Sequence, residues 1–294
     1  MFRDIVARIF RNLNYRLLYV DSWPVQKFLK ASILLSTVFY KRWLKKARAG
    51  EIVEITLDKD IKMKVDTSKA MGAAFYWTGF HEFNEWRFLN QHLKPDMVFV
   101  DVGANQGEYA LFAAKRLTNG IVLAYEPVEH FLQQLTENIS RNGYGNIRVF
   151  PYGLSNAPKH LPIYMGETGA GENEGLATVF PSNDRKRFIQ DIDLKVFDDV
   201  VPELKLQRMD FMKIDVEGSE LDVLKGSYKT IKHFRPWIML EVSDITYETA
   251  GYSVGDIIKF FEPLKYSCFA IGKGGTLKKI TTIPSFCNLV FAPN

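Results

Sequence analysis

The sequence predicts a doubly wound α/β domain around a mostly parallel sheet of seven strands. From residue 97 onward, short apolar segments alternate with stretches that have the helical period, and the apolar segments are nearly continuous. Continuous apolar strands are typical of sheets that helices cover on both faces. The expected strands are 97–102, 121–125, 147–150, 211–214, 237–240, 267–271 and 288–291, with helices near 81–92, 108–117, 129–141 and 220–226.

The composition is that of a globular protein. Of 294 residues, 47% are hydrophobic and 24% are charged, which excludes a disordered or fibrous chain. Two cysteines, Cys268 and Cys287, are too few for a disulfide framework or a four-cysteine zinc site, and they fit a reducing compartment. The longest apolar run, 31–40, is too short to span a bilayer, and no secretory signal is recognisable. We therefore expect a cytoplasmic enzyme or binding protein.

The first 48 residues differ in charge from the rest of the chain. Eleven Lys and Arg stand against Asp4 and Asp21 there, which gives +9, whereas the remainder carries −5. Apolar residues recur every fourth position up to Leu17, and a second helix is expected over 25–48 after Pro24. We divide the chain into a basic helical extension, 1–48, and a domain, 49–294. The second helix is expected to end in a basic cluster of Lys41, Arg42, Lys45, Lys46 and Arg48.

We consider three interpretations of the extension. Its helices can pack on the domain or on a second subunit. A basic amphipathic helix can also make a peripheral contact with the inner face of a membrane. The third interpretation, a nucleic-acid partner, is not expected, because the domain is acidic and attracts phosphate poorly.

Two segments of the domain have distinctive patterns. Alternation of apolar and polar residues over 51–65 predicts a β-hairpin. The stretch 155–196 is rich in glycine and has little periodicity, so we expect an irregular insertion that covers a bound substrate. Its candidate contacts are Tyr164, Phe180 and Arg185. The alternative is a disordered surface loop.

A strand that ends in an acid, followed by a glycine turn, marks the expected cofactor site. The segment 98–108 reads VFVDVGANQGE, with Asp101 at the strand end and Gly103 and Gly107 in the turn before a helix. Ligands of open α/β sheets bind at the carboxyl ends of strands, and a helix N-terminus offers N–H groups to an anion. The glycine spacing differs from the G-x-G-x-x-G of dinucleotide-binding turns.

S-adenosylmethionine fits these residues better than a dinucleotide does. We expect Asp101 near its ammonium group and the glycine turn near its carboxylate. Glu126, at the end of the next strand, is expected on its ribose hydroxyls. The alternative, that both acids only cap helices, is disfavoured because they stand at adjacent strand ends beside the turn.

Four segments resemble the FkbM family of S-adenosylmethionine-dependent methyltransferases. They are VDVGAN at 100–105, YEP at 125–127, GLS at 153–155, and KIDVEGSEL at 213–221 with VLKG at 223–226. The resemblance covers about 79–242 and implies the Rossmann-like fold of class I methyltransferases and O-methylation of sugars, polyketides and related metabolites. Gln106 and the segment 196–198 depart from the family's pattern, which leaves the role of Asp198 open. The expected cofactor-binding residues are Asp101, Gly103, Asn105, Gly107, Glu126, Pro127 and Leu154.

The expected catalytic residues are Asp215 and Glu217. Methyl transfer to oxygen is an in-line displacement, and a base that takes the hydroxyl proton adds roughly 10²–10⁴ in rate. Both acids follow the fourth strand, beside the methyl-donating end of the cofactor by analogy with other class I methyltransferases, and strand alternation would point them to the same side. The alternative is that they only stabilise the start of a helix.

Two further groups are weaker candidates. Glu241 closes the fifth strand, and three acids at strand ends could hold Mg²⁺. Their spacing defines no ligand set, so no metal-binding residue is predicted. His81 precedes the helix before the first strand and is another candidate base.

The sequence as a whole predicts an O-methyltransferase that moves a methyl group from S-adenosylmethionine to a hydroxyl. The expected acceptor is a sugar of a glycan or glycolipid. One alternative is a non-catalytic cofactor-fold module, which would need none of Asp101, Gly103, Glu126 and Asp215. An RNA methyltransferase is the other, and the acidic domain disfavours it.

Overall fold

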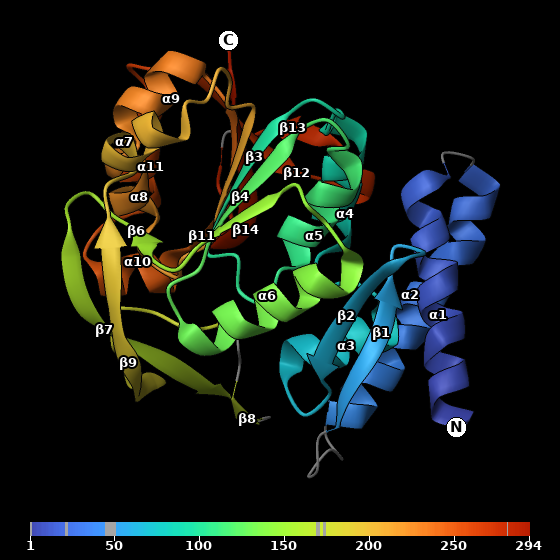
Figure 1. The fold of residues 1–294 in the computed structure, drawn as a ribbon. Coiled ribbons are helices and arrows are strands. Elements are labelled where there is room, and N and C mark those ends of the chain that lie inside the picture. Colours follow the sequence, from blue (N-terminus) through green and yellow to red (C-terminus); the bar gives the residue numbers. More distant parts are fainter. Residues whose placement is uncertain (1, 21–22, 45–50, 169–170, 173–174, 281) are drawn as a thin grey trace.

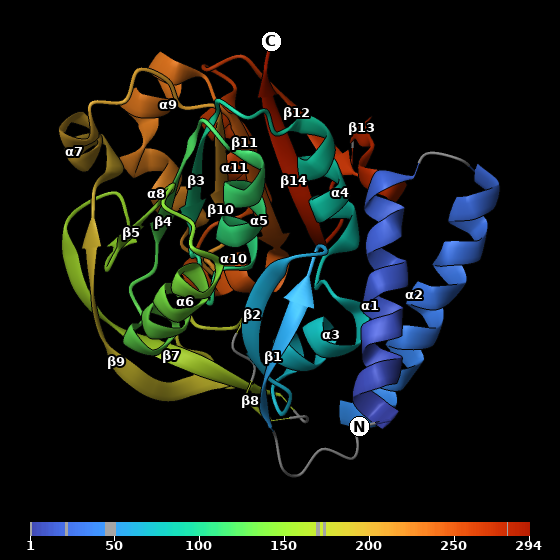
Figure 2. The ribbon, with the colours of Figure 1, turned by 45° about the vertical axis from the view of Figure 1, so that its right-hand side comes forward.

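The structure is a computed structural model that describes residues 2–20, 23–44, 51–168, 171–172, 175–280 and 282–294. Figure 1 and Figure 2 show a twisted central sheet between helices, a smaller sheet on one side of it and a helical hairpin on the other. Lys45, Lys46 and Arg48 of the expected basic cluster lie outside the described residues.

The central sheet has eight strands within the described residues, in the order β13-β12-β14-β11-β10-β3-β4-β5. The neighbours from β11 to β5 are parallel, and those from β11 to β13 are antiparallel. Chain order reverses between β3 and β10, which makes the sheet doubly wound, as predicted. The strands are β3 (Val98–Val102), β4 (Ile121–Tyr125), β5 (Ile147–Phe150), β10 (Phe211–Ile214), β11 (Trp237–Ser243), β12 (Tyr266–Ile271), β13 (Leu277–Lys279) and β14 (Phe286–Pro293).

Seven of these strands are the predicted ones, and β13 is an addition. It pairs with β12 at the edge of the sheet. β13 has three residues, of which only Leu277 is apolar, so its sequence carries no strand pattern.

Helices cover both faces of this sheet. Alternate strand residues point to opposite faces, so that Phe99 and Phe211 stack on one face while Val100 and Met212 point to the other. The first face packs against α4 (Phe83–His92), α5 (Glu108–Arg116) and α6 (Glu129–Asn142), and the second against α8 (Glu220–Gly226), α9 (Tyr228–Phe234) and α11 (Val254–Phe261). Shorter helices are α7 (Phe197–Val200), α10 (Asp244–Ala250) and the 3₁₀ turns Val201–Leu204 and Lys273–Gly275.

The smaller sheet occupies the segment for which the sequence predicted an irregular insertion. Its strands β6 (Gly153–Leu154), β7 (Lys159–Thr168), β8 (Gly171–Glu172) and β9 (Arg185–Lys195) lie in the order β6-β9-β7-β8. The prediction of an irregular segment was wrong because the apolar alternation of these strands is short and flanks a glycine-rich stretch. Within the described residues, buried apolar side chains alternate only at Ile163 and Met165 of β7 and at Ile192 and Leu194 of β9. The sheet packs on the start of α6 through Val128, Phe131 and Ile163.

The N-terminal helices α1 (Phe2–Tyr19) and α2 (Trp23–Leu44) form an antiparallel hairpin beside the predicted β1–β2 hairpin (Ile52–Leu57 and Ile61–Asp66). They pack on α3 (Ala70–Thr78), where the Asn14 amide donates hydrogen bonds to the Thr78 carbonyl (2.9 Å) and the Ser36 hydroxyl (3.1 Å). A search of the described helices finds none with the length and hydropathy for crossing a bilayer.

Candidate active site

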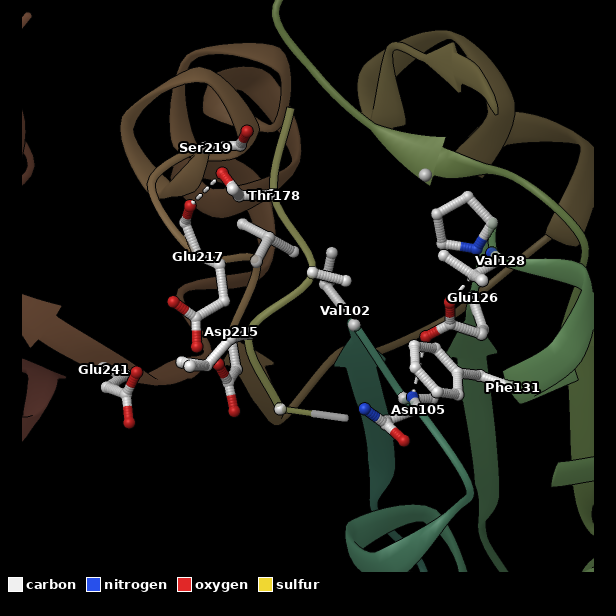
Figure 3. A pocket seen from close by; sticks show the side chains of 18 of the residues that line it. Val102, Asn105, Glu126, Val128, Phe131, Thr178, Asp215, Glu217, Ser219 and Glu241 are labelled. Carbon is white, nitrogen blue, oxygen red and sulfur yellow. Dashed lines mark hydrogen bonds between the residues drawn. The ribbon is translucent and has the colours of Figure 1, made fainter. Parts of the chain in front are cut away.

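A cavity of about 400 Å³ lies at the carboxyl ends of β3, β4, β10 and β11. This is the expected place for a ligand site in an open α/β sheet, and the volume is typical of such sites. The turns after these strands, the start of α6 and the small sheet supply its walls. In Figure 3, Asn105, Glu126 and Phe131 line one end of the cavity, and Asp215, Glu217 and Glu241 line the other.

The turn between β3 and α5 depends on two glycines in left-handed conformations. Gly103 has φ +81°, and a Cβ atom there would lie 2.0 Å from the carbonyl oxygen of Asp215, so the turns after β3 and β10 can touch only at a glycine. Gly107 has φ +99°, and a Cβ atom there would lie 2.7 Å from Leu135 of α6. Gly103 lines the cavity, whereas Gly107 holds the turn against α6.

Glu126 connects the ends of β3 and β4. Its Oε2 accepts a hydrogen bond from the Asn105 N–H (2.7 Å), and its Oε1 accepts one from the Val128 N–H (2.9 Å). Burial raises the pKa of Glu126 to about 7. Each carboxylate oxygen has a second acceptor position, so Glu126 can also bind hydroxyl groups of a ligand in the cavity.

Gln106 is a buried donor in the same wall. It lines the cavity and is 1% exposed, and its side-chain Nε2 makes no hydrogen bond within the described part of the chain. A buried amide without a partner is costly, so a ligand acceptor atom would improve the environment of Gln106.

Asp101 and Lys213 are buried neighbours of opposite charge at the floor of the cavity, which Lys213 lines. They lie opposite each other in the parallel pairing of β3 and β10, and both are almost fully buried. Burial raises the pKa of Asp101 to about 6, while the charge of Lys213 opposes that rise. Asp101 is not among the cavity-lining residues. The Lys213 ammonium also forms an ion pair with Asp215 (2.9 Å), which does line the cavity.

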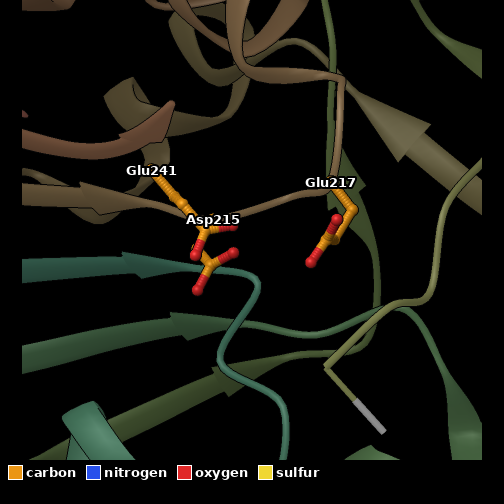
Figure 4. Close-up of side chains that lie close together, drawn as sticks. All are labelled: Asp215, Glu217 and Glu241. Atoms are coloured by element: carbon orange, nitrogen blue, oxygen red, sulfur yellow. The ribbon is translucent and has the colours of Figure 1, made fainter. Parts of the chain in front are cut away.

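The carboxyl groups of Asp215, Glu217 and Glu241 meet at one end of the cavity. Their oxygens approach to within 4.8 Å of one another, and Figure 4 shows Asp215 between the two glutamates. Burial raises the pKa of Glu217 to about 8, although Arg185 opposes this rise. Burial and the charges of Asp215 and Glu217 also raise the pKa of Glu241. Such a cluster can accept protons and hydrogen bonds from hydroxyl groups, and carboxylate oxygens are the ligands that Mg²⁺ prefers.

Glu217 is held in an uncommon conformation. Its φ is +53°, which a non-glycine residue rarely adopts unless its surroundings impose it. Glu220 accepts hydrogen bonds from the N–H groups of Val216 and Gly218 on either side (both 3.0 Å). From the small-sheet segment, the Thr178 hydroxyl donates to the Glu217 carbonyl (2.7 Å) and Arg185 pairs with its carboxylate (2.6 Å). The small sheet thus fixes the Glu217 side chain.

A second acidic wall comes from the segment before α4 and from α5. Glu82 accepts hydrogen bonds from the Tyr109 hydroxyl and from the Asn288 amide (2.6 Å), and Glu108 accepts one from the Trp86 indole (2.6 Å). Burial, together with the charge of Glu82, raises the pKa of Glu108 to about 8. Most of the titratable side chains that line the cavity are therefore acidic.

Comparison with known proteins gives the family. The model of the methyltransferase FkbM domain matches residues 101–268, more than half of the chain. The chain belongs to the FkbM family of methyltransferases. The resemblance seen in the sequence motifs is confirmed.

Several relatives of this FkbM-family chain are known. It is 32% identical over 183 residues to the AMB antimetabolite synthetase AmbE of Pseudomonas aeruginosa. The matching region covers 52% of this chain but only 9% of AmbE. It is 27% identical to the hexuronic acid methyltransferase AglP of Haloferax volcanii, over 62% of this chain and 68% of AglP. The crystal structure of methyltransferase FkbM from Methylobacillus flagellatus has a TM-score of 0.49 at 17% identity, with 89% of this chain and 60% of that chain covered.

The structure of the FkbM-family chain gathers most of the predicted site residues. Gly103, Asn105, Glu126, Pro127, Leu154, Asp215 and Glu217 all line the cavity, together with Glu241, His81 and Arg185. Asp101 and Gly107 lie behind its wall. Asp198, whose role the sequence left open, accepts hydrogen bonds from the first N–H groups of α9, at Lys229 (2.9 Å) and Thr230 (2.8 Å).

Sequence reasoning missed Lys213, Gln106 and the acids Glu82 and Glu108 as parts of this site. Lys213 did leave a signal, because it is a charged residue inside an apolar strand, two positions before Asp215 and therefore on the same side of the strand. Glu82 and Glu108 left none, since acids near helix starts are common on protein surfaces.

Proposed function

We propose that this FkbM-family methyltransferase binds S-adenosylmethionine in the cavity and transfers its methyl group to a hydroxyl of a sugar in a glycan or glycolipid. The observation that carries the proposal is the layout of the cavity. An oriented carboxylate, Glu126, lies at one end, and a cluster of three carboxyl groups around Asp215 lies at the other. One cavity can thus hold a donor and an acceptor together.

The chain's residues fit the donor. Glu126 would accept hydrogen bonds from ribose hydroxyls, and apolar residues beside it, Val128, Phe131 and Leu154, would contact the base. The side-chain amide of Gln106, whose Nε2 has no partner within the described residues, would serve the amino-acid end, because the N–H groups of 103–107 already donate to protein acceptors. When bound, S-adenosylmethionine supplies an electrophilic methyl group.

The acceptor end suits a hydroxyl group. Asp215 would accept the hydroxyl proton at Oδ1 or Oδ2, while the buried ammonium of Lys213 orients its carboxylate from below. Glu217 and Glu241 would orient neighbouring hydroxyls by accepting their hydrogen bonds. The acidic lining suits polyhydroxylated acceptors, and it offers the phosphates of RNA few basic partners, which disfavours RNA as a substrate.

The relative AglP supports a sugar as the acceptor class, because its name describes a methyltransferase that acts on hexuronic acid. The chain covers about two thirds of that relative. The carboxylate-lined cavity adds a physical reason, since several sugar hydroxyls can be bound at once by several fixed acceptors.

Glu126→Gln tests the donor site. The change keeps the size of the side chain but replaces one acceptor oxygen with an NH₂ group, so a charge-assisted hydrogen bond to the ribose is lost. We expect S-adenosylmethionine binding to weaken by roughly 10- to 100-fold, since such bonds contribute about 1.5–3 kcal/mol. Isothermal titration calorimetry measures the affinity.

The matched control is Glu129→Gln, three positions later, where the side chain is exposed at the start of α6. This control should bind S-adenosylmethionine like the unmodified protein. Equal affinity in the two variants would remove Glu126 from the donor site.

A further inference from the structure

The outer face of α2 combines apolar and basic side chains in one continuous stripe. Leu34, Leu35 and Val38 are 68%, 52% and 55% exposed, and Ala31 is exposed beside them. These positions recur at the spacing of one helical face, so they form a single apolar patch. The patch points away from the domain, because Ser32 and Ser36 on the opposite face are buried against α1 and α3.

Basic residues border this patch along the same face. Lys30 lies before it and Lys41 and Arg42 lie after it, and all three side chains are exposed. Residues 23–44 contain no Asp or Glu. The stripe from Lys30 to Arg42 is about 18 Å long at 1.5 Å per residue. We call this stripe the α2 face.

The neighbouring helix α1 has the same character. Phe2, Ile5 and Ile9 are 81%, 41% and 51% exposed, and Arg8 and Arg16 are exposed among them. Asp4 is the acid of this helix, and it accepts a hydrogen bond from the Tyr76 hydroxyl (2.6 Å). Exposed apolar side chains therefore gather on both helices of the hairpin, in the segment 1–48 whose net charge is +9.

We propose that the α1–α2 hairpin docks on an anionic membrane surface through the α2 face. Exposed apolar side chains bordered by Lys and Arg, without acids, are the pattern of helices that lie in the membrane interface. Charge complementarity favours a membrane over a second copy of the chain. Two copies would bring two basic α2 faces together, whereas anionic headgroups neutralise these charges. The acidic remainder of the chain, at −5, would be repelled by the same surface and would face away from it.

The hairpin is fixed to the domain, so docking would also orient the domain. Arg11 donates a buried hydrogen bond to the Tyr76 carbonyl, and Arg87 of α4 donates one to the Leu17 carbonyl. Ala7, Tyr15 and Leu18 of α1 belong to the same apolar core as α3, α4 and α5. The helix α3 that carries the hairpin also supplies Met71 to the cavity wall.

Vesicle sedimentation with the full chain tests the proposal. The protein should co-sediment with vesicles of phosphatidylcholine and phosphatidylglycerol, much less with phosphatidylcholine alone, and less at high salt. The double variant Leu34→Glu/Val38→Glu should reduce binding to the anionic vesicles at least tenfold, because it places two acids in the apolar patch. Lys30→Glu/Arg42→Glu should reduce it as well and should weaken its dependence on salt.

The matched control is Phe188→Glu, which puts an acid at an exposed aromatic residue of β9, away from the hairpin. It should bind the anionic vesicles like the unmodified protein. All changed side chains are exposed, and thermal unfolding will verify that each variant is folded.

Three results would overturn the proposal. The unmodified protein could fail to bind anionic vesicles, or the α2-face variants could bind as well as the control. In the third result, sedimentation equilibrium shows that the unmodified protein is a dimer and that Leu34→Glu/Val38→Glu is a monomer, and the protein does not bind vesicles. That result would assign the α2 face to a contact between copies of the chain.

Discussion

Asp215→Asn should lower kcat by about 10²-fold or more while S-adenosylmethionine affinity stays nearly unchanged. Asparagine keeps the size of the side chain and most of its hydrogen bonds, but it cannot accept the hydroxyl proton. Asp215 lies at the acceptor end of the cavity, away from Glu126, so the donor site should be intact. The rate is measured with methyl-labelled S-adenosylmethionine and whichever sugar the unmodified protein methylates in a screen of saccharides.

The control for this experiment is Asp199→Asn, an exposed aspartate of α7, which should keep full activity. Near-normal turnover of Asp215→Asn would remove Asp215 from the reaction and make Glu217 the next base to test.

A chelator distinguishes two ways of activating the hydroxyl, proton transfer to a carboxylate and activation by a bound cation. Loss of activity with a chelator, restored by Mg²⁺, would mean that Asp215, Glu217 and Glu241 act as metal ligands.

Lys213→Met should lower the free energy of unfolding by about 3–5 kcal/mol, because it leaves buried carboxylates without their cation. The Lys213 side chain is 5% exposed, between Asp101, which is fully buried, and Asp215. Burial alone would lower the pKa of Lys213, but the charges of Asp215 and Asp101 outweigh it and hold the pKa above its usual value. Methionine has a similar length, so little packing is lost. Urea denaturation measures the change.

Two comparisons distinguish lost charge from lost packing in this experiment. Lys225→Met, at an exposed lysine of α8, should change stability little. Adding Asp101→Asn to Lys213→Met should restore part of the lost stability.

The loss in free energy of unfolding caused by Lys213→Met should also be smaller near pH 5 than near pH 8. Carboxyl groups with raised pKa values are protonated at low pH, and their stability penalty develops as the pH rises through those values. If the loss in free energy of unfolding is the same at both pH values and is unchanged by Asp101→Asn, the electrostatic explanation is contradicted.

The central sheet could be predicted from the sequence because its strands are covered on both faces. Segments such as 98–102 and 121–125 are apolar at nearly every position, and an acid stands near each strand end, Asp101 one residue before the end of the first and Glu126 directly after the second. The small sheet could not be predicted in this way. The apolar alternation of β7 and β9 is short, with Ile163 and Met165 buried in the first and Ile192 and Leu194 in the second, and most other residues of β9 are exposed or half-buried.

The candidate site could be predicted where a residue follows a strand in the chain. Glu126 and Asp215 stand directly after β4 and β10, so topology alone brings them to one edge of the sheet. Asp101 was expected at the cofactor, but it lies beside Lys213 because the registers of β3 and β10 place these residues side by side. Glu82 and Glu108 reach the cavity from other segments, and only tertiary packing reveals them, whereas Arg185 was already a candidate contact from the sequence.

The central claim is that one cavity holds the methyl donor between Glu126 and Asp215. A crystal structure of the protein with S-adenosylhomocysteine, the demethylated product of the donor, tests this claim most directly. We expect its ribose hydroxyls within hydrogen-bonding distance of the Glu126 carboxylate and its sulfur facing the cluster of Asp215, Glu217 and Glu241. Density for the ligand away from Glu126, or with its sulfur turned away from Asp215, would contradict the account.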